Sequence, residues 1–214
     1  MSSTTSPTTL RLFAAVLPPA PAAVELADAV RRLRDLPGAD RLRWTGQEGR
    51  HFTLAFMGEV DAALLPELTV RLERAAYRTE PFRLRVRGGG HFGGRTLWAG
   101  AAGGIDELRL LAERAGAAAR RAGVPMDERH HSYRAHLTLA RGAAGREVDL
   151  EPYVEALTGF EGRAWDVSEL VLVRSRLPVS GVAGERPRYE PIARCPLGRG
   201  RPVHPGAGSA GPGG

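Results

Sequence analysis

A four-residue pattern of histidine, any residue, threonine and leucine occurs twice in this chain. The first copy, HFTL, begins at His51, and the second, HLTL, begins at His136. Because the chain has only 6 His in 214 residues, a matched pair is unexpected by chance. A histidine with its ordinary pKa of about 6.5 can be protonated or neutral near pH 7. Two such residues can therefore supply one general acid and one general base.

The strand geometry expected around each copy adds a threonine to each histidine. Alternate side chains of a β-strand point to opposite faces of the sheet, so residues two apart share a face. His51 is therefore expected to share a face with Thr53 and Ala55, and His136 to share one with Thr138 and Ala140. A threonine hydroxyl can donate a hydrogen bond to a phosphate oxygen. A lone histidine in such a strand is more often structural, but the matched pair favours catalysis.

Composition restricts the class of protein. Hydrophobic residues make up 43% of the chain and charged residues 25%, which is typical of a globular protein. No stretch approaches the roughly 20 apolar residues of a transmembrane helix, and the short apolar run near the start ends at Pro18 and Pro19. The single Cys195 cannot form an internal disulfide, which favours a cytoplasmic location.

The charge of the chain is positive. All 30 basic residues are arginine, and they face 24 acidic residues to give a formal charge of +6. This excess is compatible with a polyanionic substrate such as RNA, although many ordinary solvated surfaces have a similar charge.

Elements that could position the two histidines alternate along the chain. Leucine and alanine recur at the spacing of one buried helical face in the second and third predicted helices. Helices are predicted for residues 20–36, 62–77, 105–122 and 151–157. Strands are predicted for residues 10–16, 42–44, 52–57, 82–87, 96–99, 135–141, 164–167, 170–174 and 189–193.

The order of these elements in the first half is loosely repeated in the second. It predicts an α+β fold in which two pseudo-symmetric lobes of antiparallel sheet, with helices on their outer faces, surround a central cleft. Residues 10–195 are expected to form this single domain. Residues 1–9 are expected to be a disordered leader, and the Gly/Pro-rich residues 196–214 a disordered tail.

The chain resembles the two-histidine (2H) phosphoesterases, and within them the RNA 2′,3′-cyclic phosphodiesterases, also called 2′-5′ RNA ligases. The paired HxTL motifs are highly specific for this group. One position departs from the family pattern, since Ala135 replaces the proline that usually precedes the second histidine. The supporting segments are RLF at 11–13, RW at 43–44, HFTLAFMGE at 51–59, RTLWAG at 95–100, YRAHLTLAR at 133–141 and LVLVRSRL at 170–177.

The resemblance implies a reaction and roles for the paired residues. It implies hydrolysis of RNA 2′,3′-cyclic phosphate ends to 2′-phosphomonoesters, with no metal and no cofactor. His51 would donate a proton to the leaving O3′, and His136 would be the base that activates water. Arg141 completes an HxTxxR pattern and could bind phosphate or the next nucleotide, or could be a solvated arginine at a strand end.

Aromatic residues could stack a nucleobase, which stabilises binding by about 1 to 3 kcal/mol per base. The candidates are Trp44, Phe56, Phe92 and Tyr133. Strand alternation puts Phe56 on the face opposite His51, so core packing is the safer interpretation for Phe56 and also for Trp44. Tyr133, beside the second motif, is the residue predicted to stack a base.

Two other clusters favour simpler interpretations. His130 and His131 precede the second motif, but no cysteine or acidic ligand completes a zinc spacing with them. Residues 88–94, GGGHFGG, lack the pattern of a phosphate-binding loop and are predicted to be a hairpin connection.

Two other functions remain open beside the phosphodiesterase. The same residues could join RNA ends reversibly through 2′-5′ bonds, or the protein could be a noncatalytic RNA- or nucleotide-binding module. In each case the expected partner is RNA or a nucleotide, and the protein is expected to be a monomer without a membrane or an obligate protein partner.

Overall fold

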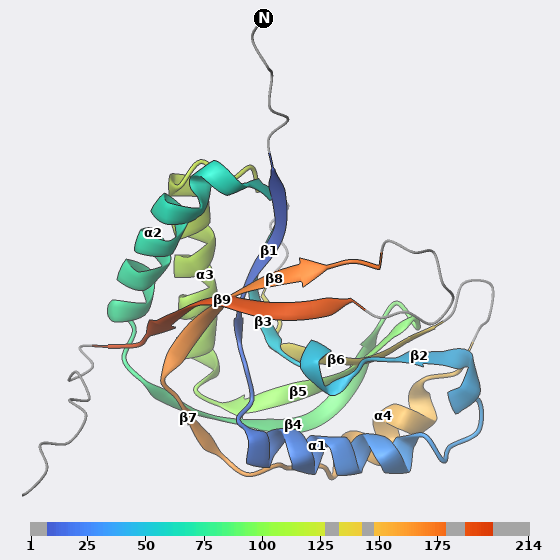
Figure 1. The fold of residues 1–214 in the computed structure, drawn as a ribbon. Helices are drawn as coiled ribbons and strands as arrows, with labels where there is room; N and C mark the ends of the chain where they lie inside the picture. Colours follow the sequence, from blue (N-terminus) through green and yellow to red (C-terminus); the bar gives the residue numbers. More distant parts are fainter. Residues whose placement is uncertain (1–7, 127–132, 143–147, 179–186, 199–214) are drawn as a thin grey trace, which may run out of the picture.

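Two antiparallel sheets form the framework of the protein (Figure 1). The computed structural model describes residues 8–126, 133–142, 148–178 and 187–198. Sheet A has the strand order β3-β1-β8-β9, and sheet B has the order β2-β6-β5-β4-β7. The two histidine motifs therefore lie in different sheets, the first at β3 and the second at β6. The strands are β1 Thr9–Val16, β2 Leu42–Trp44, β3 Phe52–Asp61, β4 Phe82–Phe92, β5 Thr96–Gly103, β6 His136–Gly142, β7 Trp165–Val167, β8 Glu169–Arg176 and β9 Arg188–Pro196.

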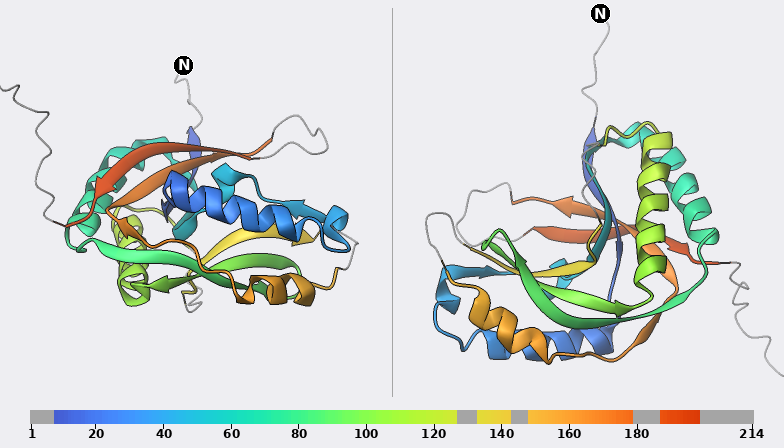
Figure 2. Two further views of the ribbon diagram at one scale, coloured as in Figure 1. Left: turned by 90° about the horizontal axis from the view of Figure 1, so that it is seen from below. Right: turned by 180° about the vertical axis from the view of Figure 1, so that it is seen from behind.

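Each sheet is covered on one face by a pair of helices (Figures 1 and 2). α2 and α3 pack against sheet A, whereas α1 and α4 lie against sheet B. α1 follows a strand of sheet A but packs on sheet B, and α3 follows a strand of sheet B but packs on sheet A. This exchange packs the helix that follows each sheet's strand against the other sheet. The helices are α1 Ala20–Leu33, α2 Leu65–Tyr77, α3 Ile105–Arg121 and α4 Glu151–Thr158.

The predicted elements all occur, with shifts at their ends that have local causes. The helix expected from residue 62 begins with a 3₁₀ turn, Ala62–Leu64, and the α-helix starts only at Leu65. Pro66 lies in its first turn, where a residue without an N–H group leaves no helical hydrogen bond unmade.

At the two ends of the domain, the structure describes a few residues that were expected to be leader or tail. Thr9 already belongs to β1, and Leu197 is buried in the core. Residues 1–7 of the expected leader and residues 199–214 of the expected tail lie outside the described residues.

The buried apolar side chains form two clusters, because β1 is apolar on both of its faces. Leu12, Ala14 and Val16 belong to the main core under the helices. Phe13 and Ala15 point to the opposite face of sheet A, where they pack with side chains of β8. This second cluster lies on the face of sheet A that is turned away from α2 and α3, and it is the surface on which the first histidine rests.

The glycine run expected to be a hairpin connection is mostly strand. β4 continues through Gly88–Gly90 to Phe92, and the turn that follows contains Gly93 and Gly94, whose φ angles of 53° and 63° favour glycine. The prediction placed the connection too early because glycine usually weakens strands.

Close packing explains why glycine is present within this strand. A Cβ atom on Gly89 would lie 2.5 Å from Cδ1 of Leu157, and one on Gly90 would lie 2.4 Å from Cζ2 of Trp98. The two glycines therefore let α4 and the indole of Trp98 approach the backbone of β4.

We expect Gly90→Ala to disturb the site through Trp98. The added methyl group forces the indole to move, and such overpacking typically costs about 1–3 kcal/mol of stability. Urea unfolding and tryptophan fluorescence measure the two effects. Gly159→Ala is the matched control, because its Cβ would meet no atom within 4 Å and its φ of −87° suits alanine. Equal stability of the two variants would contradict the expected clash.

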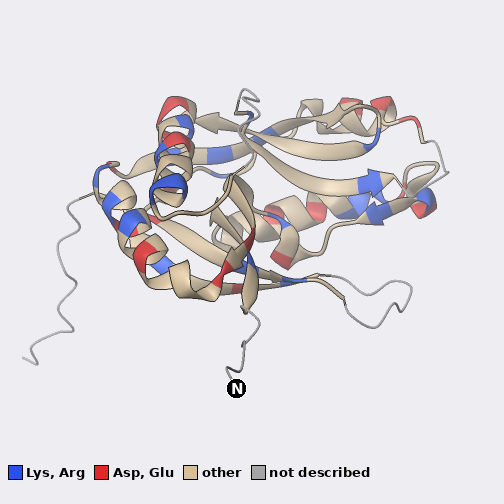
Figure 3. Ribbon diagram, turned by 90° about the horizontal axis from the view of Figure 1, so that it is seen from above, with Lys and Arg blue, Asp and Glu red and all other residues tan. Residues whose placement is uncertain are grey.

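Charged residues of both signs are mixed on the helices. Blue and red segments alternate along α2 and α3 (Figure 3), and ion pairs join Arg71 to Glu67 at 2.6 Å and Arg109 to Asp106 at 3.2 Å. Across the described ranges, no helix is long and apolar enough to span a bilayer.

Candidate active site

His51, immediately before β3, is held between aromatic rings. Its imidazole stacks on Phe13, with ring centroids 4.5 Å apart and planes inclined by 24°. The ring of Tyr189, from β9, meets the imidazole edge-on at 5.4 Å. The His51 ring also forms a hydrogen bond with the backbone of Glu48. Stacking and hydrogen bonding together restrict the orientation of this imidazole.

The surroundings of His51 lower its pKa to about 4. Burial is the largest cause, because it disfavours the charged imidazolium, and the charge of His136 acts in the same direction. The hydrogen bond with Glu48 opposes both. His51 is therefore neutral at pH 7 in the free protein. The strands β3 and β6, which carry the two motifs, contact each other, and this contact, together with the effect of His136, indicates that the two imidazoles lie near each other.

This lowered pKa predicts a loss of stability in acid. Between the unfolded pKa of about 6.5 and the folded value of about 4, the unfolded chain binds more protons, so stability falls as the pH falls through this window. By pH 4.5 the loss from His51 is roughly 2–3 kcal/mol. We expect His51→Gln to lack this part of the loss. Urea unfolding of both proteins at pH 7.5 and 4.5 measures the loss of unfolding free energy between the two pH values. An equal loss in the parent and in His51→Gln would contradict the lowered pKa of His51.

His136, the first residue of β6, is oriented in a comparable way. Its Nδ1 lies 2.7 Å from the carbonyl oxygen of Arg134, so Nδ1 acts as the donor and Nε2 is left for other partners. Phe92 meets the imidazole edge-on at 4.9 Å, and Trp98 does so at 6.4 Å. The Arg134 guanidinium lies over both aromatic rings, at 5.8 and 5.7 Å from their centroids. Each catalytic candidate is thus fixed by a nearby backbone group and by aromatic rings.

The two motifs share an irregularity that the sequence does not reveal. In β3, Thr53 pairs with Ala15 but Ala55 pairs with Ala14, so Leu54 is an extra residue in the strand. Such a β-bulge reverses the faces of the residues that follow it, here Ala55 and Phe56, until a second bulge at Met57 restores the original alternation. Ala55 consequently lies in the main core, which corrects the prediction that it shares a face with His51.

In β6 the same bulge occurs at the same place in the motif. Thr138 pairs with Trp98 and Ala140 with Leu97, so Leu139 is the extra residue. Ala140 therefore lies in the main core, which corrects the prediction that it shares a face with His136. In both strands the residue five positions after the histidine is therefore returned to the histidine face. Simple alternation would have put that residue on the opposite face.

The residues brought back by the bulges are Phe56 and Arg141. Phe56 pairs with Phe13, the residue that stacks on His51, and its side chain is 52% exposed. The prediction that Phe56 packs in the core is therefore wrong. Arg141 is exposed and follows Thr138 on the His136 face of β6.

Thr53 and Thr138 lie beside their histidines, as alternation predicts before the bulge. Both residues are half-buried. Among the described residues, neither hydroxyl forms a hydrogen bond with another side chain or with the backbone. Both hydroxyls are therefore available to an anion held near the imidazoles.

Tyr189 is a site residue that the sequence analysis placed only in a strand. Burial raises the pKa of its phenol, and the charges of Arg141 and Arg11 lower it. Arg141 of sheet B thus acts electrostatically on a residue of sheet A that touches His51. No local motif marks Tyr189, because it approaches His51 only through the pairing of β9 with β8.

Tyr133 is partly buried against the core, whereas a residue that stacks a nucleobase needs an exposed ring face. It packs against the main core, its hydroxyl is buried, and burial raises the pKa of the phenol. Its role in base stacking stays a prediction.

Comparisons with known proteins agree with this geometry. Residues 18–177 match the model of the 2′-5′ RNA ligase superfamily. The chain belongs to this superfamily. The resemblance to two-histidine phosphoesterases is therefore confirmed.

Curated relatives in the superfamily carry one name, RNA 2′,3′-cyclic phosphodiesterase. The protein of Thermus thermophilus is 31% identical over 186 residues, covering 80% of this chain and 85% of that protein. The protein of Geobacillus stearothermophilus is 32% identical over 162 residues, covering 72% of this chain but only 47% of that protein. The chain thus spans about half the length of the Geobacillus relative.

The superfamily fold is also seen in a solved structure, E. coli LigT in its apo form. It has a TM-score of 0.68 and 25% identity, covering 91% of this chain and 100% of LigT. LigT has also been crystallised with 3′-AMP, ATP and phosphate. The predicted α+β fold with two antiparallel sheets and outer helices is confirmed.

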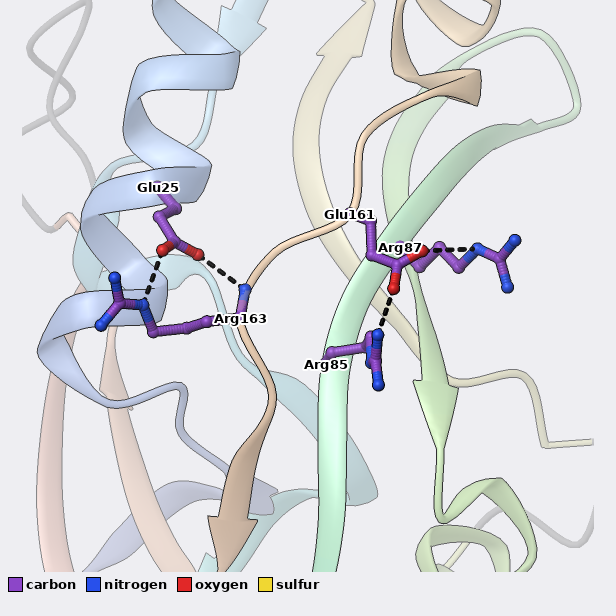
Figure 4. A network of polar contacts seen from close by, with 5 residues as sticks. All are labelled: Glu25, Arg85, Arg87, Glu161 and Arg163. Atoms are coloured by element: carbon purple, nitrogen blue, oxygen red, sulfur yellow. Dashed lines mark hydrogen bonds and ion pairs between the residues drawn. The ribbon is translucent and has the colours of Figure 1, made fainter.

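A groove elsewhere in this superfamily member, between α1 and α4, contains none of the predicted site residues. It has a volume of about 670 Å³ and is lined by Glu25, Asp28, Arg32 and residues of α4. Figure 4 shows the polar contacts beside it: Arg163 donates to Glu25 at 2.6 and 2.7 Å, and Glu161 pairs with Arg85 and Arg87. These contacts join α1 and β4 to the segment before β7, which indicates a structural role.

His91 has a partner of its own outside the motifs. Its Nε2 lies 2.9 Å from a carboxylate oxygen of Glu151. Within the described ranges, no group of three or more His, Cys, Asp or Glu side chains is placed to hold a metal ion. His130 and His131 lie outside the described residues.

Proposed function

We propose that the chain hydrolyses RNA 2′,3′-cyclic phosphate ends to 2′-phosphomonoester ends by paired histidine catalysis. The observation that carries this proposal is the pair of neighbouring imidazoles, His51 and His136, each oriented by a hydrogen bond to nearby backbone. The name shared by the curated relatives supports the same reaction. A module that only bound RNA would have no use for a matched acid and base.

In the proposed reaction, a water oxygen attacks phosphorus as the bond from phosphorus to O3′ breaks. His136 accepts the proton of the water, and His51 gives a proton to O3′, following the family assignment. The free protein holds His51 neutral, so this proton must be gained when substrate binds. The negative charge of a phosphate beside the imidazole favours that protonation. After one turnover the proton on His136 returns to His51 through solvent.

Three further residues would hold the phosphate during this step. The hydroxyls of Thr53 and Thr138 would donate hydrogen bonds to its nonbridging oxygens. The Arg141 guanidinium, on the same face as His136, would neutralise part of the charge or bind the next phosphate. These side chains require no metal ion for the step, so we propose a metal-independent enzyme.

The test is to incubate the protein and a chelator with an oligoribonucleotide that ends in a 2′,3′-cyclic phosphate. We propose conversion to a 2′-phosphate end, read by chromatography and by resistance to enzymes specific for 3′-phosphates. Joining to a second RNA with a 5′-hydroxyl would reveal 2′-5′ ligation instead. Binding without either product would favour the noncatalytic module and reject the proposal.

We also infer that the enzyme works as a monomer in the cytoplasm. Both histidines come from one chain, and the buried Cys195 is unpaired. Light scattering at the concentration used for the assay tests the oligomeric state, and a dimer would contradict it.

A further inference from the structure

We propose that Arg43 and Arg141 together bind the phosphodiester that links the last nucleotide of the substrate to the one before it. The proposal deepens the proposed function and rests on it, because it names the part of the RNA chain that sheet B would hold. It also assigns a role to Arg43, a residue of β2 that lies outside both motifs. Such a site would make an oligonucleotide a better substrate than a mononucleotide.

The two arginines lie directly opposite each other on the face of sheet B that carries His136. Arg43 pairs with Arg141 across β2 and β6, and Arg141 pairs with Thr96 on its other side. Directly paired residues share a face, with Cβ atoms about 4.5–5.5 Å apart. Trp98 follows Thr96 by two residues in β5 and contacts the imidazole of His136. The shared face is therefore the one that carries the second histidine.

The charges of this pair are not balanced by the protein around it. Like charges that lie directly opposite each other destabilise a sheet. Both arginines are exposed, and neither forms an ion pair with another described residue. Other strand arginines face carboxylates: Arg11 is opposite Glu59 and Arg83 is opposite Asp166, with ion pairs at 3.6 and 3.7 Å. The pair on the histidine face thus offers two cations to an anion from outside the described part of the chain.

β2 connects the arginine pair to the first histidine. It is the edge strand of sheet B, beside β6 (Figure 1). Beyond its last residue, Thr45 continues the pairing by donating its N–H to the carbonyl oxygen of Leu139 at 2.8 Å. The 3₁₀ turn Gln47–Gly49 then contacts β9 and leads to His51. The arginine pair therefore lies at the rim of the same site, where a longer substrate can continue past the sheet edge.

The distance from His136 favours the next phosphate over the reacting one. The β5 partners of His136 and Arg141 are Gly100 and Thr96, which are four residues apart, or about 13 Å. Thr138, between the two, is the donor proposed for the reacting phosphate. The second arginine of the pair lies one strand further out, by about 5 Å. Guanidinium groups are always charged and bind phosphate oxygens bidentately, so this position suits a phosphodiester one nucleotide away.

The experiment compares Arg43→Gln with the parent protein on three substrates. These are a nucleoside 2′,3′-cyclic phosphate, a dinucleotide ending in 2′,3′-cyclic phosphate, and the same dinucleotide with an uncharged methylphosphonate linkage. We expect kcat/KM to fall about 10-fold on the natural dinucleotide, as for loss of a hydrogen bond to a charged group, and to stay nearly unchanged on the other two. On the natural dinucleotide, the slope of log kcat/KM against log salt concentration should become shallower by about 0.7, because one phosphate contact is lost.

Two control variants separate a phosphate contact from other effects. Arg43→Lys keeps the charge and should keep the salt slope. Arg74→Gln removes an exposed arginine of α2, on the other face of sheet A, and should change none of the three rates. Urea unfolding should show Arg43→Gln to be at least as stable as the parent, because it relieves the repulsion from Arg141. Lower stability with an equal loss on all three substrates, or no loss on the natural dinucleotide, would each overturn the proposal.

A binding measurement keeps this inference separate from the proposed reaction. If the parent protein turned over none of the three substrates, the proposed function would fail. Calorimetric titration with a dinucleotide ending in 2′-phosphate, with the natural or the methylphosphonate linkage, would then test the arginine pair. Weaker binding of the natural dinucleotide alone to Arg43→Gln would support the pair as a phosphodiester site. Equal affinity of the variant and the parent for that dinucleotide would reject it.

Discussion

His51→Ala and His136→Ala are each expected to reduce kcat on a cyclic phosphate end by about 10²–10⁴-fold, the usual contribution of a positioned acid or base. The loss follows because, in the proposed reaction, each imidazole moves one of the two protons. The double variant should be little worse than the poorer single variant, since the residues act as a unit. Single-turnover rates measure all three losses.

The matched control for these variants is His91→Ala. This residue is also a half-buried histidine of sheet B, but it pairs with Glu151. Its removal should leave the rate within a few-fold of the parent rate. A comparable loss in His91→Ala, or full activity in either motif variant, would contradict the paired histidine mechanism.

A substrate with a better leaving group identifies which histidine is the acid. A nucleoside 3′-(4-nitrophenyl phosphate) releases nitrophenolate, which needs little protonation, so the variant lacking the acid should regain much of its activity. The family assignment predicts this rescue for His51→Ala. Rescue of His136→Ala instead would reverse the two roles. The free protein holds His51 neutral, without the proton that a general acid must donate, so this substrate tests the assignment directly.

The fold could be predicted from the sequence because its signals are local and repeated. Apolar spacing in α3 and the alternating strands report burial directly, and Leu108 and Leu111 are indeed fully buried. The histidine and threonine pairs were also visible, since a strand positions residues two apart without help from the rest of the chain. These parts of the site depend only on residue type and short spacing.

The rest of the site depends on pairing between strands, which one sequence does not display. Leu54 and Leu139 are the bulged residues, but a leucine fits a regular strand equally well. The sequence pattern therefore gives no sign that the residues after them change face. Phe56 was therefore assigned to the core. Tyr189 was overlooked for a related reason, because β9 brings it to His51 only after β1, β8 and β9 have joined in sheet A.

Removing a threonine hydroxyl should also have a large effect. Thr53→Val and Thr138→Val keep the size and β-branching of the side chain, so the strands and bulges should persist. In the proposed reaction, each variant loses one donor to the phosphate charge that grows in the transition state, and loss of one such donor typically lowers kcat by about 10²–10³-fold. Thr→Ser should retain much of the rate, because the hydroxyl remains.

The measurement must separate lost charge stabilisation from lost folding. Circular dichroism and urea unfolding should be nearly unchanged in both valine variants, since neither hydroxyl has a partner among the described residues. KM should change less than kcat, because the charge to be stabilised is greatest in the transition state. Thr96→Val, a half-buried threonine paired with Arg141 at the far end of the motif strand, is the control. If Thr96→Val lost as much activity as Thr138→Val, the loss would come from a general disturbance of sheet B rather than from removal of the hydroxyl donor beside His136.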